Sequence, residues 1–87
     1  MKLKSGFLLR EVAGQKVVLP TDGALDLNMM ITLNDTGAFL WEKLQSPITE
    51  EALVDALCAE YEIDRAVALT DVQKFLSIAR EQGFLDD

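Results

Sequence analysis

The chain changes from strand to helix within one stretch, Leu33-Asn34-Asp35-Thr36-Gly37-Ala38-Phe39-Leu40-Trp41. Its first residue closes a short apolar run that begins at Met29, which is typical of a strand. Asn34 is a preferred N-cap residue, and its side chain can accept a hydrogen bond from the amide of Thr36 or Gly37. Asp35 then lies in the first turn, where the positive end of the helix dipole favours an acid. We therefore expect a helix to begin directly after this strand.

The same stretch contains a glycine and the tryptophan of the chain. A glycine inside a helix costs about 1 kcal/mol relative to alanine. Gly37 therefore predicts that another backbone approaches the helix closely at this point. Leu40, Trp41 and Leu44 recur at helical spacing and form one apolar face, so we expect Trp41 in the core.

Two short apolar runs before this stretch predict a hairpin. They cover Gly6–Val12 and Gln15–Leu19, and Ala13-Gly14 between them suits a tight turn. Pro20 ends the second strand or marks it as an edge. A third strand is expected over Met29–Leu33.

Three helices are expected after the strands. The first covers Asp35–Gln45 and ends before Pro47. The second begins after Thr49, and Asp64 caps the third. The apolar stripe of the third helix contains Ala68, Val72, Phe75, Leu76 and Ala79. Gly83 fits the position after its end, with Phe84 and Leu85 folding back onto the helix.

The order of these elements predicts an α+β fold. A three-stranded antiparallel sheet followed by three helices corresponds to a small winged-helix-like architecture, in which the second and third helices form a helix-turn-helix pair. With 87 residues, we expect one domain over residues 1–87. The hydrophobic share of 49% favours a folded chain over a disordered one.

The composition offers little for catalysis. The sequence has no histidine, which removes the most common general base and metal ligand. Its one cysteine, Cys58, cannot build a thiolate zinc site, and we expect it to pack as a small apolar side chain. The five glycines are scattered and form no phosphate-binding loop. We therefore expect a protein that is not an enzyme and that holds no cofactor or metal.

The charge and hydropathy exclude two further classes of partner. Eight basic against 15 acidic residues give a net charge of −7, which repels nucleic acid backbones. No apolar run reaches the ~18 residues of a membrane-spanning helix.

The lysines after Met1 precede no adequate apolar segment, so no secretion signal is expected. A reducing cytoplasm is the simplest location for a chain with a single cysteine.

The central stretch resembles the signature of the PqqD family, Leu-Asn-Glu-Thr-Gly followed three residues later by Trp. Asp35 stands here in place of the usual Glu, which keeps the charge at the helix start. Further matches are Ile48-Thr49-Glu50-Glu51 leading to Tyr61, and Asp71-Val72 leading to Gly83-Phe84-Leu85. The resemblance implies a peptide chaperone that binds the leader of a ribosomally made precursor and presents it to a modifying enzyme, often a radical SAM enzyme. The product would be pyrroloquinoline quinone or another modified peptide.

The resemblance also implies where the leader binds. An extended peptide would add to the edge of the third strand, in a groove between that strand and the third helix. On this chain the strand residues are Met29, Met30, Ile31, Thr32 and Leu33, and the helix residues are Val67, Asp71, Lys74 and Ile78. The alternative for Asp71 and Lys74 is that they pair with each other, since they lie three residues apart. The alternative for Met29 and Met30 is that they fill gaps in a small core.

Two other function classes remain open from the sequence. A winged helix that binds DNA fits the order of elements, although the third helix is close to neutral and a recognition helix should be basic. An exposed strand edge also permits self-pairing, which would make the chain a dimerisation or adaptor subunit and a homodimer.

Overall fold

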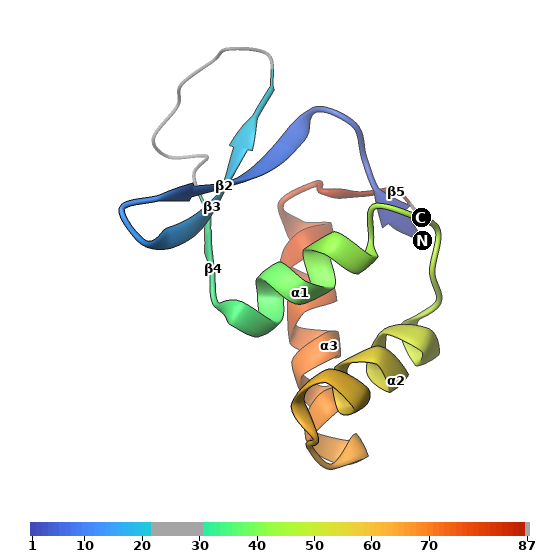
Figure 1. The fold of residues 1–87 in the computed structure, drawn as a ribbon. Helices are drawn as coiled ribbons and strands as arrows, with labels where there is room; N and C mark the ends of the chain where they lie inside the picture. Colours follow the sequence, from blue (N-terminus) through green and yellow to red (C-terminus); the bar gives the residue numbers. More distant parts are fainter. Residues whose placement is uncertain (22–30, 87) are drawn as a thin grey trace.

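The computed structural model describes residues 1–21 and 31–86 of the chain (Figure 1). The elements in order are β1 (Lys2–Leu3), β2 (Phe7–Val12), β3 (Gln15–Pro20), β4 (Ile31–Leu33), α1 (Asp35–Lys43), α2 (Glu50–Tyr61), α3 (Arg65–Glu81) and β5 (Leu85–Asp86). Strands β2, β3 and β4 form an antiparallel sheet in that order. The predicted α+β fold, a three-stranded antiparallel sheet followed by three helices, is confirmed.

The hairpin of β2 and β3 turns at the predicted dipeptide. Ala13 and Gly14 both have positive φ, 52° and 80°. This conformation is that of a type I′ turn, whose twist matches the twist of the strands it joins. The turn sets the register in which Val12 pairs with Gln15. Pro20 is the last residue of β3, as predicted.

Helix α1 begins as the sequence predicts. The amide of Gly37 donates to Asn34 Oδ1 at 2.8 Å, so Asn34 is the N-cap. The helix ends at Lys43, before the predicted end at Gln45, and Leu44 is its C-cap.

The explanation expected for Gly37 is wrong. A Cβ atom at this position would lie 3.0 Å from Asn34 Oδ1 and 3.4 Å from Leu33 Cβ. The atoms nearest to such a Cβ therefore belong to the side chains of the two residues that precede the helix, and not to another backbone. The glycine leaves room for the oxygen that caps the helix.

Helices α2 and α3 are joined by a short turn and by an ion pair. Thr49 caps α2, since its Oγ1 accepts a hydrogen bond from the amide of Ala52 at 3.1 Å. Asp64 occupies the N-cap position of α3, as predicted, but its side chain accepts no capping hydrogen bond. Arg65 donates to Asp55 of α2, and this hydrogen bond, together with the carboxylate charge, raises the pKa of the guanidinium. The pair is exposed to solvent, so it adds little to stability.

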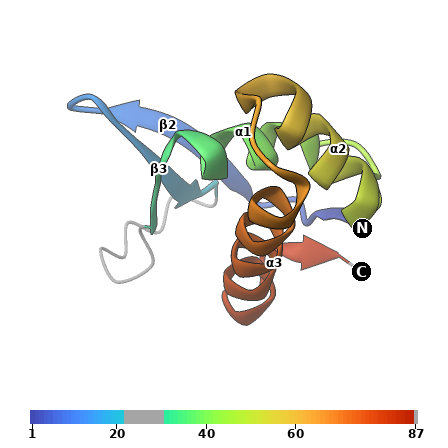
Figure 2. The same ribbon diagram turned by 90° about the horizontal axis from the view of Figure 1, so that it is seen from below.

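A second, two-stranded ribbon was not predicted. Its strands, β1 and β5, pair Lys2 with Asp86 and Leu3 with Leu85. The two chain ends consequently lie side by side, and the ribbon and the β2–β3 hairpin lie on opposite sides of α1 (Figures 1 and 2).

The core lies among the three helices, β3 and the terminal ribbon. Trp41 is 1% exposed, which confirms its predicted place in the core, and its ring meets the ring of Phe84 edge to face at 5.5 Å. The buried cluster consists of Leu3, Val18, Leu40, Trp41, Leu44, Leu53, Val54, Leu57, Ala68, Val72, Leu76, Ala79, Phe84 and Leu85. No helix in the described part of the chain is both long enough and apolar enough to cross a membrane.

Candidate functional site

Strand β4 is an edge of the sheet. It pairs with β3 on one side, in a register that places Thr32 opposite Val17. On its other side, the described residues contribute no further strand. An edge strand presents unpaired N–H and C=O groups that can bind another chain.

The hydrogen bond between Thr21 and Gly6 establishes which backbone groups of β4 face this open edge. The Thr21 amide donates to the Gly6 carbonyl at 2.9 Å, so the backbone N–H and C=O of Thr21 face β2. The same holds for the backbone groups of every second residue back along β3. The backbone groups of the residues in between, Lys16 and Val18, face β4, where they pair with Leu33 and Ile31. The N–H and C=O of Thr32 therefore point away from the sheet, toward the open edge.

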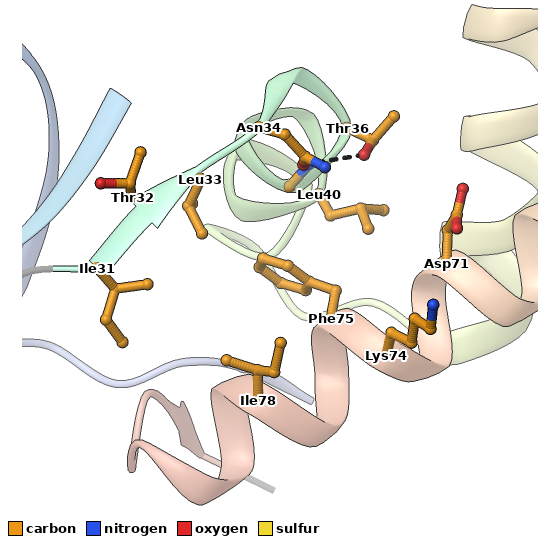
Figure 3. A pocket seen from close by; sticks show the side chains of 11 residues that line it. Ile31, Thr32, Leu33, Asn34, Thr36, Leu40, Asp71, Lys74, Phe75 and Ile78 are labelled. Carbon is orange, nitrogen blue, oxygen red and sulfur yellow. Dashed lines mark hydrogen bonds between the residues drawn. The ribbon is translucent and has the colours of Figure 1, made fainter. Parts of the chain in front are cut away.

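A cavity of about 410 Å³ lies beside this edge. It is bordered by β4, by the start of α1 and by the middle of α3 (Figure 3). The residues around it are Ile31, Thr32, Leu33, Asn34, Thr36, Gly37, Leu40, Asp71, Lys74, Phe75 and Ile78.

The walls of the cavity are mainly apolar. Ile31 and Leu33 of β4 point toward α3, where Ile78 and Phe75 point back toward them (Figure 3). Leu40 of α1 borders the same space and lies above Phe75 in the view of Figure 3. An apolar groove of this kind binds apolar side chains by removing them from water.

Two opposite charges stand on α3 at one end of the cavity. They belong to Asp71 and Lys74, which border the same space (Figure 3). In the part of the chain that the structure describes, no ion pair joins Asp71 and Lys74, so the two do not pair with each other. Both charges are therefore available to a bound partner.

The structure places most of the predicted site residues around one space. Ile31, Thr32, Leu33, Asp71, Lys74 and Ile78 all border the cavity. Val67 is half exposed and is not among the bordering residues, because it lies one turn of α3 beyond the end of the cavity. Met29 and Met30 lie outside the described residues.

Phe75 has a second role that the sequence did not predict. It packs against the core, as its place in the apolar stripe of α3 predicts, but it is only partly buried and also borders the cavity. No pattern in the sequence marks Asn34, Thr36, Gly37 and Leu40 as site residues. They border the cavity because α1 starts directly where β4 ends.

The cavity offers binding surface and few groups for chemistry. In residues 1–21 and 31–86, no three His, Cys, Asp or Glu side chains are grouped so that they could hold a metal ion. Among the described residues, Asp71 is the one carboxylate that borders the cavity, and the Cys58 thiol is not among the bordering groups.

Comparison with known proteins places the chain in a family. Residues 15–85 match the family model described as coenzyme PQQ synthesis protein D (PqqD). The chain belongs to the PqqD family. The matched region contains β3, β4, α1 and α3, so every element that borders the cavity falls within the PqqD match.

Two solved structures share the fold of this PqqD-family chain. One is described as TbiB1 in complex with the TbiA(beta) leader peptide, with a TM-score of 0.76, 26% sequence identity, and coverage of 99% of this chain and 95% of that one. The other is described as lasso peptide synthetase B1 complexed with the leader peptide, with a TM-score of 0.72, 22% identity, and coverage of 95% and 93%. Among curated proteins, none matches the sequence significantly.

Proposed function

We propose that this chain binds the leader of a ribosomally made precursor peptide, as a strand added to β4. The observation that carries the proposal is the outward-facing backbone of Thr32 on an open edge, directly beside an apolar cavity. A peptide in extended conformation would satisfy the N–H and C=O of Thr32 and place alternate side chains in the cavity. The leader peptide bound to TbiB1, a protein of the same fold, supports this choice of ligand.

The chain would act as a chaperone and would do no bond chemistry itself. By holding the leader, it would raise the effective concentration of the precursor at a maturation enzyme, which is how a weak encounter becomes a tethered one. We propose a radical SAM enzyme or another modifying enzyme as that partner, and pyrroloquinoline quinone or another modified peptide as the product. We propose the cytoplasm as the location.

The proposed binding residues divide by role. Thr32 supplies main-chain hydrogen bonds, and Ile31, Leu33 and Ile78 supply apolar contact. Asp71 and Lys74 would meet charged residues of the leader at one end of the cavity.

The open edge can be tested with a proline at Thr32. Proline has no N–H, and its ring clashes with a strand that approaches from that side, so Thr32→Pro should weaken binding of a synthetic leader about fivefold or more. The fold should survive, because proline is tolerated where the N–H of an edge strand faces outward. Isothermal titration calorimetry measures the affinity, and circular dichroism checks the fold.

Two further variants make this test specific. Thr32→Val keeps the amide and the branched shape, so it should bind the leader as the native chain does. Ile31→Pro removes an N–H that faces β3, so it should unfold the sheet. Equal affinity of Thr32→Pro and Thr32→Val would show that no peptide strand pairs with this edge.

A further inference from the structure

The side chains of β4 divide the proposed peptide into two kinds of residue. Ile31 and Leu33 point toward α3, and Thr32 points away from it and is exposed (Figure 3). Residues directly opposite each other on neighbouring strands carry their side chains on the same face. The peptide residue opposite Thr32 would therefore point into solvent, and the residues before and after it would point toward α3.

These two inward positions meet different walls. One lies beside Ile31, with Ile78 across the cavity, and the other lies beside Leu33, with Phe75 across it (Figure 3). Both positions are lined by apolar side chains, so both favour an apolar residue of the peptide. This assignment is independent of the direction of the peptide, because side chains alternate in the same way in parallel and antiparallel strands.

The ring of Phe75 limits the size of the peptide side chain that fits at the second position, beside Leu33. Its neighbours on α3, Val72, Leu76 and Ala79, are fully or almost fully buried in the core, whereas Phe75 is only partly buried. Within the described part of the chain, its ring pairs with no other aromatic ring. Leu40, which borders the same cavity, is 1% exposed and held in the core, so a larger peptide side chain could gain room mainly by displacing the ring of Phe75.

We propose that this groove selects a leader segment with two apolar side chains separated by one residue, and that Phe75 sets the size of the one beside it. The proposal rests on the proposed function and adds a sequence requirement to it. Phe75 acts as a specificity-determining residue, and the residue between the two apolar positions is free to vary.

The spacing is tested by an alanine scan of the synthetic leader of a precursor encoded beside this chain, with the full chain as the binding partner. Two positions separated by one residue should each lose about ten- to a hundredfold in affinity, since each buries an apolar side chain. The residue between them should lose little. Losses spaced three or four residues apart would indicate a bound helix and would overturn the proposal, although leader binding itself would stand.

The role of Phe75 is tested by enlarging the peptide side chain that lies beside it. Replacing that residue by Trp should weaken binding to the native chain about tenfold or more, because overpacking an apolar site is unfavourable. Phe75→Ala should bind the enlarged leader better than the original one. Ser77→Ala, an exposed change on α3 that does not border the cavity, should show the preference of the native chain.

The affinities of the Phe75→Ala chain for the two leaders decide the role of Phe75. A Phe75→Ala chain that weakens both leaders by the same factor would show that Phe75 is structural only, and the proposal would be wrong. Phe75→Leu, a milder change, repeats the comparison if Phe75→Ala does not fold. If no leader binds the native chain, the proposed function fails and this inference fails with it.

Discussion

At the scale of single residues, the side-chain oxygen of Asn34 organises the junction between β4 and α1. It accepts hydrogen bonds from the Gly37 amide at 2.8 Å and from Thr36 Oγ1 at 3.1 Å. Because a Cβ on Gly37 would lie 3.0 Å from this oxygen, cap and glycine depend on each other. Both residues also border the cavity, so the cap fixes one end of the candidate site.

A double-mutant cycle should reveal this dependence. Asn34→Ala should lower the free energy of unfolding by about 1 kcal/mol through loss of the cap. Gly37→Ala in the native chain should gain less than the ~1 kcal/mol expected from helix propensity, since the new methyl pushes on the cap oxygen. In the Asn34→Ala chain that oxygen is gone, so the gain should appear. Urea unfolding measures all four chains, and strictly additive effects would contradict this account.

The cap was predictable and the role of Gly37 was not, for a physical reason. An N-cap depends on residue type and local sequence, both of which are visible in Asn34 and the acid that follows it. A glycine shows only that space is needed, and the atom that uses the space depends on the rotamer of Asn34.

At the scale of elements, the end of α3 positions the C-terminal strand. Gly83 has a φ of +77°, and its amide donates to the Arg80 carbonyl at 3.0 Å. The Phe84 amide donates to the Ala79 carbonyl at 2.8 Å, which completes a Schellman motif. The reversal carries Phe84 onto the ring of Trp41, and Leu85 follows into β5.

Substitution of Gly83 should therefore lower the free energy of unfolding, because it disturbs the packing of Phe84 and Leu85 in the core. Gly83→Ala should cost about 1–2 kcal/mol, because a Cβ is disfavoured at left-handed angles. Gly83→Asn should cost less, since asparagine tolerates this conformation. Thermal unfolding of the two variants gives the comparison. If Gly83→Ala is as stable as Gly83→Asn, the left-handed end does not determine the packing of Phe84.

Elements with local signals were predicted, and elements made by distant contacts were not. The hairpin turn, the helix starts and Gly83 each depend on a few neighbouring residues. The β1–β5 ribbon joins Leu3 to Leu85, and a strand of two residues has no periodicity to detect. Phe75 and Leu76 are adjacent on the apolar stripe of α3, and only the docking of β4 decides that Phe75 borders the cavity.

At the scale of the whole molecule, the candidate site lies where the sheet meets the helices. The family resemblance predicted a groove between the third strand and the third helix, and a cavity is present there. The direction of the Thr32 backbone could not be predicted, because it depends on the register of the complete sheet. The net charge of −7, with Asp71 beside Lys74 on α3, continues to disfavour DNA as the partner.

Strand addition to β4 is tested most directly by amide hydrogen exchange at this strand, measured by NMR with and without the leader peptide. In the free chain, the Ile31 and Leu33 amides should exchange slowly because they face β3, and the Thr32 amide should exchange fast. Adding the leader should slow exchange at Thr32 selectively. Protection of Thr32 that grows with protein concentration alone would indicate self-pairing at this edge instead. Fast exchange at Thr32 when the leader is bound would contradict strand addition to β4.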